Sequence, residues 1–319
     1  MDHNRRVASG WQYTRGLHDL GGGCFAYLQP DGSLGWSNAG LVRGEDRSLL
    51  VDTLFDLPLT RDMLGAMTAV TGAAPIATLV NTHANGDHCW GNELVEGAEI
   101  IASTACRDEM VEGLQPDAFA AMLGTEGLGA GVDYARERMG CFEFEGITLT
   151  PPDRVFDGCL DLDVAGTRVE LIEVGPAHTR GDVLVHVPDQ STIFTGDILF
   201  IDGTPIMWEG PVANWVNACD LMLGLDVEKV VPGHGPITDK TGVAHVRDYL
   251  LYIEDEARKR YEAGMSADEA ARDIRLGEFS SWGDTERIVV NVDTLFREFR
   301  GDTTPADVIT LLDLMAELA

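Results

Sequence analysis

The sequence predicts an α/β protein with a helical extension behind it. Over about residues 20–238, short β-branched runs alternate with stretches of helical spacing, and histidine or aspartate motifs follow several runs. After residue 238, the chain consists of amphipathic helical stretches. Its 319 residues, 45% of them hydrophobic, suffice for a sizeable core. We expect a domain over residues 1–238 and a C-terminal helical extension over 239–319 that packs on it, because no Gly/Ser linker separates them.

The expected strands are short and bounded by turn residues. They lie at 24–29, 36–44, 48–53, 76–82, 98–103, 147–152, 160–166, 167–175, 182–189, 191–200 and 228–231. The two runs on either side of Pro188 predict a hairpin. Apolar residues at helical spacing predict helices at 57–70, 104–114 and 213–225, and residues 116–145 are loosely helical.

The extension is expected to contain long helices at 243–264, 286–301 and 305–318. Between the first two, Ser266 and Glu269 match a capping box, in which a hydroxyl and a carboxylate satisfy free N–H groups at a helix start. The apolar face of VITLLDLM in the last helix suits either a cover over the active-site cleft or a homodimer contact.

Composition excludes several classes of function. The chain has 53 acidic and 23 basic residues, a net charge of -30, which repels nucleic acids and anionic membranes. No run of about 18 apolar residues predicts a membrane span. The N-terminal MDHNRRVASGWQ has no apolar signal region, and the six cysteines form no CxxC pair. We therefore expect a cytoplasmic protein that acts on a small molecule.

The chemistry lies in five segments where a predicted strand meets a loop. They are Asp52 in LLVDT, the group His83, Asp87 and His88 in NTHANGDH, His178 in GPAHTRGD, Asp197 in FTGDILF, and His234 in PGHGP. Imidazole and carboxylate are ligands of zinc, iron and manganese. A lone histidine at a strand end is usually structural, but four of the eight histidines fall in these segments. The combination indicates a metal site.

The order LLVDT, HxxxDH, GPAHTxGD, TGD, PGHG resembles the metallo-β-lactamase fold superfamily and covers about residues 20–238. The resemblance implies a four-layer αββα sandwich with metals at one edge of two facing sheets. It fixes the reaction less closely, because the superfamily includes thioesterases, lactonases, β-lactamases, sulfatases, nucleases and iron dioxygenases. Asp197 resembles the bridging aspartate of glyoxalase II and lactonases, where zinc β-lactamases have Cys or Ser.

The resemblance also implies a division of the ligands. One metal would take His83, residue 85 and His178; a second would take Asp87, His88 and His234; Asp197 would bridge them. Asp52 would lie behind the ligands and orient their loop. Asn85 departs from the family, since a histidine is usual there.

Asparagine offers only a neutral carbonyl oxygen, a weaker donor than imidazole. Three outcomes are therefore open. The Asp87 site holds one zinc alone, Asn85 ligates weakly and two metals bind, or His83, His178 and Asp197 hold iron as two histidines and a carboxylate. We expect one or two zinc ions, with iron or manganese as alternatives.

The expected reaction is hydrolysis, in which a metal lowers the pKa of its water towards about 7 and supplies hydroxide. Asp87 is the expected catalytic residue, which orients that hydroxide or moves its proton. Trp90, Met207 and Trp208 are candidate pocket residues. The chain has three lysines and no basic cluster near the motifs, which favours a largely apolar ester, lactone or thioester. The alternatives are a polyketide cyclase or thioesterase of the same fold, a mononuclear non-haem iron dioxygenase, and a non-catalytic binding protein.

Overall fold

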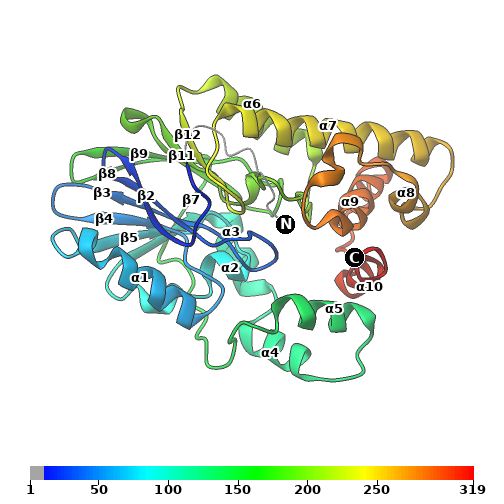
Figure 1. Cartoon of the computed structure of the whole chain (residues 1–319), viewed down its shortest axis with the longest axis horizontal. Coiled ribbons are helices and arrows are strands. Elements are labelled where there is room, and N and C mark those ends of the chain that lie inside the picture. Colours follow the sequence, from blue (N-terminus) through cyan, green and yellow to red (C-terminus); the bar gives the residue numbers. More distant parts are fainter. Residues whose placement is uncertain (1–10) are drawn as a thin grey trace.

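The computed structural model describes residues 11–319, which form two facing β-sheets covered by helices (Figure 1). The first sheet has seven strands in chain order: β1 (Gly16–Gly21), β2 (Cys24–Leu28), β3 (Ala39–Arg43), β4 (Ser48–Val51), β5 (Ile76–Val80), β6 (Glu99–Ser103) and β7 (Arg154–Phe156). The second has five, in the order β12 (Lys229–Val231), β11 (Thr192–Phe194), β10 (Val183–Val187), β9 (Thr167–Glu173) and β8 (Cys159–Val164). The start of the chain, MDHNRRVASG, lies outside the described residues.

Ten α-helices occur in the described part of the chain. They are α1 (Leu57–Thr71), α2 (Gly86–Cys89), α3 (Thr104–Glu112), α4 (Pro116–Gly124), α5 (Ala130–Met139), α6 (Val212–Gly224), α7 (Lys240–Glu262), α8 (Ala267–Asp273), α9 (Ile288–Arg300) and α10 (Val308–Leu318). The predicted class, an α/β sandwich with C-terminal helices, is confirmed.

Alternation of side chains along the strands builds the four layers. In β4, Leu49 belongs to the core between the two sheets together with Val185 of β10. The next residue, Leu50, points the other way and packs in the same core as Met63 of α1. All four are fully buried. A strand that is covered on both faces, as β4 is, therefore needs apolar residues at consecutive positions, and the SLLV run has them.

Strand direction decides where the functional loops lie. The strands β1 to β4 pair antiparallel, but β4 to β7 pair parallel, as do β11 and β12 in the other sheet. The carboxyl ends of parallel neighbours lie at one edge of a sheet. The loops after β4, β5, β11 and β12 can therefore meet at one edge of the sandwich.

Two expectations about strands were wrong. The run at 147–152 forms no strand; the sheet continues instead through β7, a few residues later. Pro151 and Pro152 supply no N–H for a ladder, which explains why pairing starts beyond them. The strand β1 was not predicted, because GLHDLG lies at the sheet edge, is largely half-exposed and has little apolar alternation. The hairpin of β10 and β11 around Pro188 is confirmed.

The C-terminal helices pack on the sandwich. α7 lies along α6, and α9 packs against α7 and α8. Tyr249 of α7 and Leu295 of α9 belong to the same hydrophobic core as Trp215 of α6. The capping box is confirmed: Ser266 Oγ accepts from Glu269 N, and Glu269 Oε2 accepts from Ser266 N. The division into two domains at residue 238 stays a prediction.

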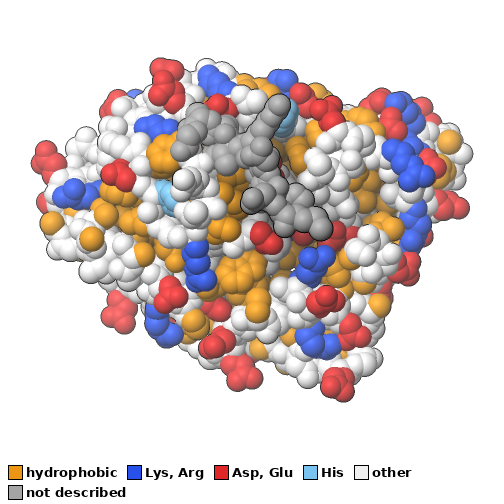
Figure 2. All heavy atoms as spheres, viewed as in Figure 1, with side chains coloured by type: hydrophobic (Ala, Val, Ile, Leu, Met, Phe, Trp, Pro, Cys, Tyr) orange, Lys and Arg blue, Asp and Glu red, His pale blue; other side chains and the backbone are white. Residues whose placement is uncertain are grey.

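Acidic side chains surround much of the face seen in Figure 2, with basic ones scattered between them. Among residues 11–319, no helix combines the length and the apolar character that a membrane crossing requires. The cytoplasmic location and the homodimer contact stay predictions.

Substitution of a buried leucine in α9 tests whether the extension is integral to the fold. Leu295 is fully buried in the shared core. Leu295→Ala should lower the free energy of unfolding by about 2–5 kcal/mol through lost burial and a cavity. Urea unfolding followed by circular dichroism should show one transition. Leu251→Ala on α7 is the control, since Leu251 is 46% exposed; two separate transitions in the wild type would contradict the shared core.

Candidate metal centre

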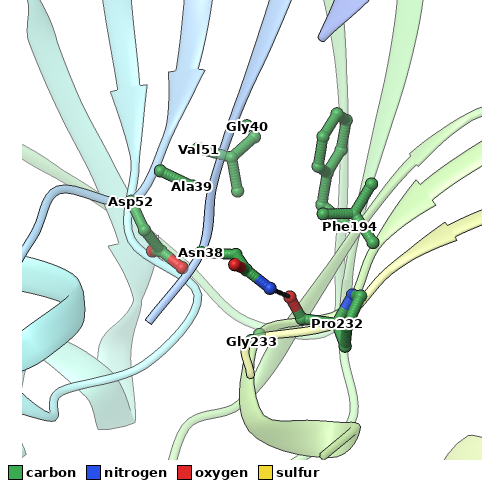
Figure 3. Close-up of a pocket in the computed structure, with 10 residues that line it drawn as sticks. Asn38, Ala39, Gly40, Val51, Asp52, Phe194, Pro232 and Gly233 are labelled. Atoms are coloured by element: carbon green, nitrogen blue, oxygen red, sulfur yellow. Dashed lines mark hydrogen bonds between the residues drawn. The ribbon is translucent and has the colours of Figure 1, made fainter. Parts of the chain in front are cut away.

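Six side chains with metal-ligand chemistry meet at the edge of the sandwich where the loops after β5, β9, β11 and β12 come together. They are His83, Asp87, His88, His178, Asp197 and His234, all buried. Every ligand predicted from the motifs therefore lies in one place. Residues next to the centre, among them Asp52 at the end of one sheet and Gly233 at the end of the other, border a cavity of about 10 Å³ (Figure 3).

Asp197 is the centre of the group. Its Oδ2 lies 3.3 Å from Nε2 of His178 and 3.4 Å from Nε2 of His234. The same oxygen is 3.7 Å from His83 Nε2, and the other carboxylate oxygen is 3.1 Å from His88 Nε2. Four imidazoles thus present the same ring nitrogen to one carboxylate, which is the position expected for a bridging ligand.

Asp87 lies on one side of this centre. Its Oδ2 is 3.3 Å from His234 Nε2 and 3.9 Å from His88 Nε2. Asp87, His88 and His234 form one set of ligand atoms that can hold a metal ion, and His83, His88 and Asp197 form another. The set of Asp87, His88 and His234 is the one expected for the second metal. In the other set, His88 accompanies His83 and Asp197, whereas Asn85 and His178 were expected there.

Each histidine of the centre is bonded through Nδ1. His88 Nδ1 donates to Asp52 Oδ2 at 2.9 Å, as predicted for the aspartate behind the ligands. His178 Nδ1 faces the Ile206 carbonyl at 2.7 Å, and His234 Nδ1 faces the Gly32 carbonyl at 3.1 Å. A carbonyl oxygen only accepts, so these nitrogens carry the hydrogen and Nε2 is left for a ligand role.

Asp52 holds the loop that carries His83 and His88. Its Oδ1 accepts from the Thr82 backbone N–H and its Oδ2 from the Thr82 hydroxyl, both at 2.7 Å. The hydroxyl oxygen, 3.0 Å from His83 Nδ1, then accepts from that ring. Asp52 has a left-handed backbone with φ of 63°, a strained conformation for a non-glycine residue that the surrounding bonds must hold.

Burial and charge divide the histidines into two pairs. Burial lowers the pKa of His83 well below its usual value and lowers that of His178. Burial opposes charge on His88 and His234 too, but Asp197 and Asp87 outweigh it: the pKa of His88 is well above normal and that of His234 rises to about 9. Protons on this pair neutralise the carboxylates, and a metal cation would take over that task.

Asn85 contacts the centre without replacing a histidine. Its Nδ2 lies 3.0 Å from Nε2 of His178. Because Nδ1 of that ring donates to Ile206, Nε2 carries a lone pair and Asn85 donates to it. The amide therefore occupies, in this conformation, the lone pair that a metal would use.

The donor set fits a divalent metal. Nε2 of His83 is buried and makes no hydrogen bond, and the buried Nε2 of His88 and Oδ1 of Asp197, which lie 3.1 Å apart, have no partner of good hydrogen-bond geometry. Buried polar atoms without partners are rare, and each costs free energy unless something binds it. Three such atoms facing one another, all of ligand type, match what a zinc, iron or manganese site presents.

Sequence reasoning missed a stack behind His234. The ring of Phe200 lies nearly parallel to the His234 imidazole, at 7° and 5.1 Å between centroids. The guanidinium of Arg287, a fully buried residue before α9, lies 5.3 Å from the Phe200 ring. Phe200 follows the TGD motif closely, but nothing in the sequence links it to residue 287.

A second unpredicted contact fixes the His234 loop from the first sheet. Asn38 Nδ2 donates to the carbonyls of Pro232 (Figure 3) and Gly235, at 3.0 and 2.8 Å. The neighbouring Ser37 hydroxyl donates to the backbone carbonyl of Asp87 at 2.5 Å. The bonds of Asn38 join the two sheets across the site, and the bond of Ser37 joins two loops of the first sheet. In the sequence these residues had no signal beyond a polar pair inside an apolar run.

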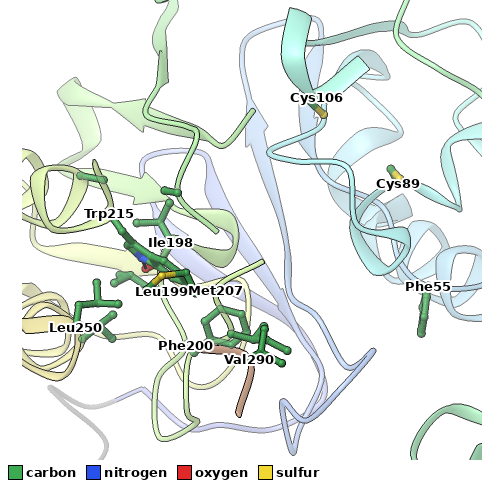
Figure 4. Packing of buried hydrophobic residues seen from close by; sticks show 14 of the residues in the cluster. Phe55, Cys89, Cys106, Ile198, Leu199, Phe200, Met207, Trp215, Leu250 and Val290 are labelled. Atoms are coloured by element: carbon green, nitrogen blue, oxygen red, sulfur yellow. Dashed lines mark hydrogen bonds between the residues drawn. The ribbon is translucent and has the colours of Figure 1, made fainter. Parts of the chain in front are cut away.

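The three candidate pocket residues lie in different surroundings. Trp90 is 7% exposed and packs in an aromatic cluster with Phe55 and Phe144. Met207 is 1% exposed and lies near Trp215 (Figure 4). Trp208 is half-buried, and its backbone N–H donates to the carbonyl of His178. The first two serve as core; their role in a pocket, and that of Trp208, stays a prediction.

The remaining histidines among residues 11–319 take no part in the centre. His186 bonds to Glu170 on the neighbouring strand at 2.9 Å, and His18 bonds to the Thr14 carbonyl. His245 is exposed on α7. His3 lies outside the described residues.

Comparison with known proteins identifies the family. The Metallo-beta-lactamase superfamily profile matches residues 34–234. Acyl-coenzyme A thioesterase MBLAC2 of Gallus gallus is 29% identical over 208 residues, which cover 62% of this chain and 72% of that protein. The Homo sapiens protein of the same name is 27% identical over 211 residues, with the same coverage.

Two solved structures show the fold. The sec-alkylsulfatase Pisa1 from Pseudomonas sp. superposes with a TM-score of 0.68 at 18% identity, over 92% of this chain and 52% of that one. The match thus spans about half of the longer sulfatase. The metallo-beta-lactamase FIM-1 from Pseudomonas aeruginosa, in its mono-zinc form, gives a TM-score of 0.54 at 20% identity over 76% of this chain and 97% of that one.

This chain belongs to the metallo-β-lactamase superfamily, as its motifs predicted. The superfamily consists mainly of metallo-hydrolases and its fold binds divalent metals, so the prediction of an enzyme of this class is confirmed.

A methyl group at Gly233 should disturb the centre. A Cβ there would lie 2.0 Å from Asp197 Oδ1, so that the carboxylate has to move. We expect Gly233→Ala to bind zinc at least about tenfold more weakly, the scale of losses on disturbing groups around a metal. Titration against a chromogenic chelator measures it. Gly203→Ala, whose Cβ meets nothing within 4 Å, should keep wild-type affinity; equal affinity in both variants would contradict the geometry.

Proposed function

We propose that this chain is a metal-dependent hydrolase of apolar acyl thioesters, with simple esters and lactones as related substrates. One observation carries the proposal: four buried imidazoles present Nε2 to the Asp197 carboxylate, with three ligand atoms unpartnered. Relatives named acyl-coenzyme A thioesterase support the choice of thioesters within the superfamily.

Asp87, His88, His234 and Asp197 would hold a zinc ion. A divalent ion bound there supplies Lewis acidity, which polarises a carbonyl oxygen and lowers the pKa of water. His83 and His178 complete a further site only if Asn85 turns away from His178 Nε2. We therefore propose one tightly held ion, with a second site of lower affinity.

Asp87 is the residue of this chain that would handle the proton. Its side chain is 12% exposed, against 3% for Asp197, so it is the carboxylate of the centre that most readily meets water and substrate. Its backbone carbonyl is held by Ser37 and its Oδ2 faces His234. A carboxylate so fixed can orient an attacking water and accept its proton.

The charge of the chain favours an uncharged acyl carrier over a phosphorylated one. Arg180, close in sequence to His178, is paired with Glu112 at 2.9 Å and is 3.9 Å from Glu109. Arg15 lies over the Trp36 ring and faces Asp62. Apolar side chains gather in the middle of the face seen in Figure 2. Acyl-coenzyme A is thus a substrate to be tested beside a short neutral thioester, which we expect to have the lower KM.

Turnover of thioesters tests the function directly. We expect the zinc-loaded protein to release thiol from a neutral acyl thioester, with activity lost in chelator and restored by zinc. Asp87→Asn should lower kcat by about 10²–10⁴-fold, because a positioned acid or base contributes that much. The control is His186→Gln, which alters a buried histidine outside the centre. Chelator-resistant turnover, or full activity in Asp87→Asn, would contradict the mechanism.

Metal analysis of Asn85→His tests the number of ions. Elemental analysis should find about one zinc per chain in the wild type and about two in Asn85→His, because a histidine supplies the third nitrogen of a site. Two ions in the wild type would mean that Asn85 ligates or is tolerated. One iron would favour oxygen chemistry at His83, His178 and Asp197, and no metal would overturn the proposed function.

A further inference from the structure

The most unexpected support of the metal centre comes from the C-terminal helix α9. Asn291 in this helix is 1% exposed. Its Nδ2 donates to the carbonyl of Pro205 and to Tyr249 Oη, both at 2.8 Å. Its Oδ1 accepts from the Met207 backbone N–H, also at 2.8 Å. The amide thus binds the loop that contains Pro205 and Met207, more than eighty residues away in the sequence.

The bond to Met207 reaches the centre through one peptide group. The N–H of Met207 and the carbonyl of Ile206 belong to the same peptide unit. That carbonyl accepts the hydrogen bond from His178 Nδ1 at 2.7 Å. The chain of contacts therefore runs from Asn291 Oδ1 through the Ile206–Met207 peptide to the His178 ring, and consecutive hydrogen bonds of this kind polarise and strengthen one another.

We propose that Asn291 is a positioning residue for the metal centre, which fixes the orientation and tautomer of His178 through the Ile206–Met207 peptide. With the hydrogen held on Nδ1, Nε2 keeps its lone pair towards the centre. The inference rests on the proposed function, because His178 matters only if a metal binds.

Neighbouring contacts show that this loop depends on the extension for its shape. Thr294 of α9 donates from Oγ1 to the Met207 carbonyl at 2.7 Å, and Arg287 donates to the Thr204 carbonyl at 2.9 Å. Beyond the loop, the Trp208 N–H donates to the His178 carbonyl. Of these bonds, only that of Asn291 falls on the peptide that contacts the imidazole.

The test uses the full-length protein with zinc and three variants. Asn291→Leu keeps most of the volume but removes the acceptor, and Asn291→Asp keeps an oxygen for the Met207 N–H. Tyr134→Phe is the matched control, because it deletes a buried hydrogen bond between α5 and Glu286 that does not fall on the Ile206–Met207 peptide. Zinc affinity is measured by chelator competition, the absorption spectrum is recorded with cobalt, and thermal unfolding is followed on the metal-free proteins.

We expect Asn291→Leu to bind zinc about tenfold more weakly at the second, lower-affinity site that His178 would complete, the lower end of losses from groups behind a ligand, with a changed cobalt spectrum at that site. Asn291→Asp should restore most of the affinity. Tyr134→Phe should lower the unfolding temperature but leave both metal readouts unchanged. If Asn291→Leu does not fold, Asn291→Ala removes the same acceptor without added bulk, and the ¹⁵N signals of the zinc-loaded wild type should report a protonated Nδ1 on His178.

The outcomes separate the two proposals. A wild type that binds no metal overturns the proposed function and this inference with it. A wild type that binds a second zinc while Asn291→Leu binds that second zinc equally, with the same cobalt spectrum, overturns only the role of Asn291. The same holds if Tyr134→Phe weakens zinc as strongly as Asn291→Leu does, since the effect would then be one of general stability.

Discussion

The buried carboxylate of Asp197, faced by four imidazoles, is the interaction on which the architecture of this protein depends. An isolated charge in such a place costs far more than a folded chain can offset. Asp197 and Asp87 raise the pKa of His88 and His234, which favours protons on these rings beside the carboxylates, and a cation would replace those protons when it binds. The negative charge of the centre thus requires a cation or protons to neutralise it, and the donor atoms without partners mark the place where a cation would bind.

Holding these groups together requires support behind every ring. Asp52 holds two of the histidines, directly for His88 and through Thr82 for His83, while the carbonyls of Ile206 and Gly32 hold the others. These supports come from both sheets. The strained backbone of Asp52 and the contact of Asn38 with the loop after β12 belong to the same scheme, in which the site is the place where the two halves of the sandwich are joined.

The C-terminal helices extend this scheme beyond the superfamily domain matched at residues 34–234. Their contribution is twofold. Arg287 contacts the Phe200 ring that lies behind His234, and Asn291 bonds the peptide that lies behind His178. A relative without such helices must brace these two histidines by other means. The difference offers a physical reason why members with the same ligand motifs can differ in metal affinity and reaction.

The sequence by itself determined the fold class, the histidines and aspartates that gather at the centre, and the odd position at Asn85, because motifs of histidine and aspartate at strand ends are local patterns that need no knowledge of packing. Local periodicity also predicted most helices and strands. It failed at residues 147–152, where two prolines prevent pairing, and at the edge strand β1, where apolar alternation is weak. Only the tertiary structure decided which oxygen each Nδ1 meets, that Asn85 donates to His178, and that Trp90 and Met207 lie in the core. It alone brought Asn38, Phe200, Arg287 and Asn291 to the site, because their contacts span distant segments whose approach is set by the packing of sheets and helices and leaves no pattern in the chain.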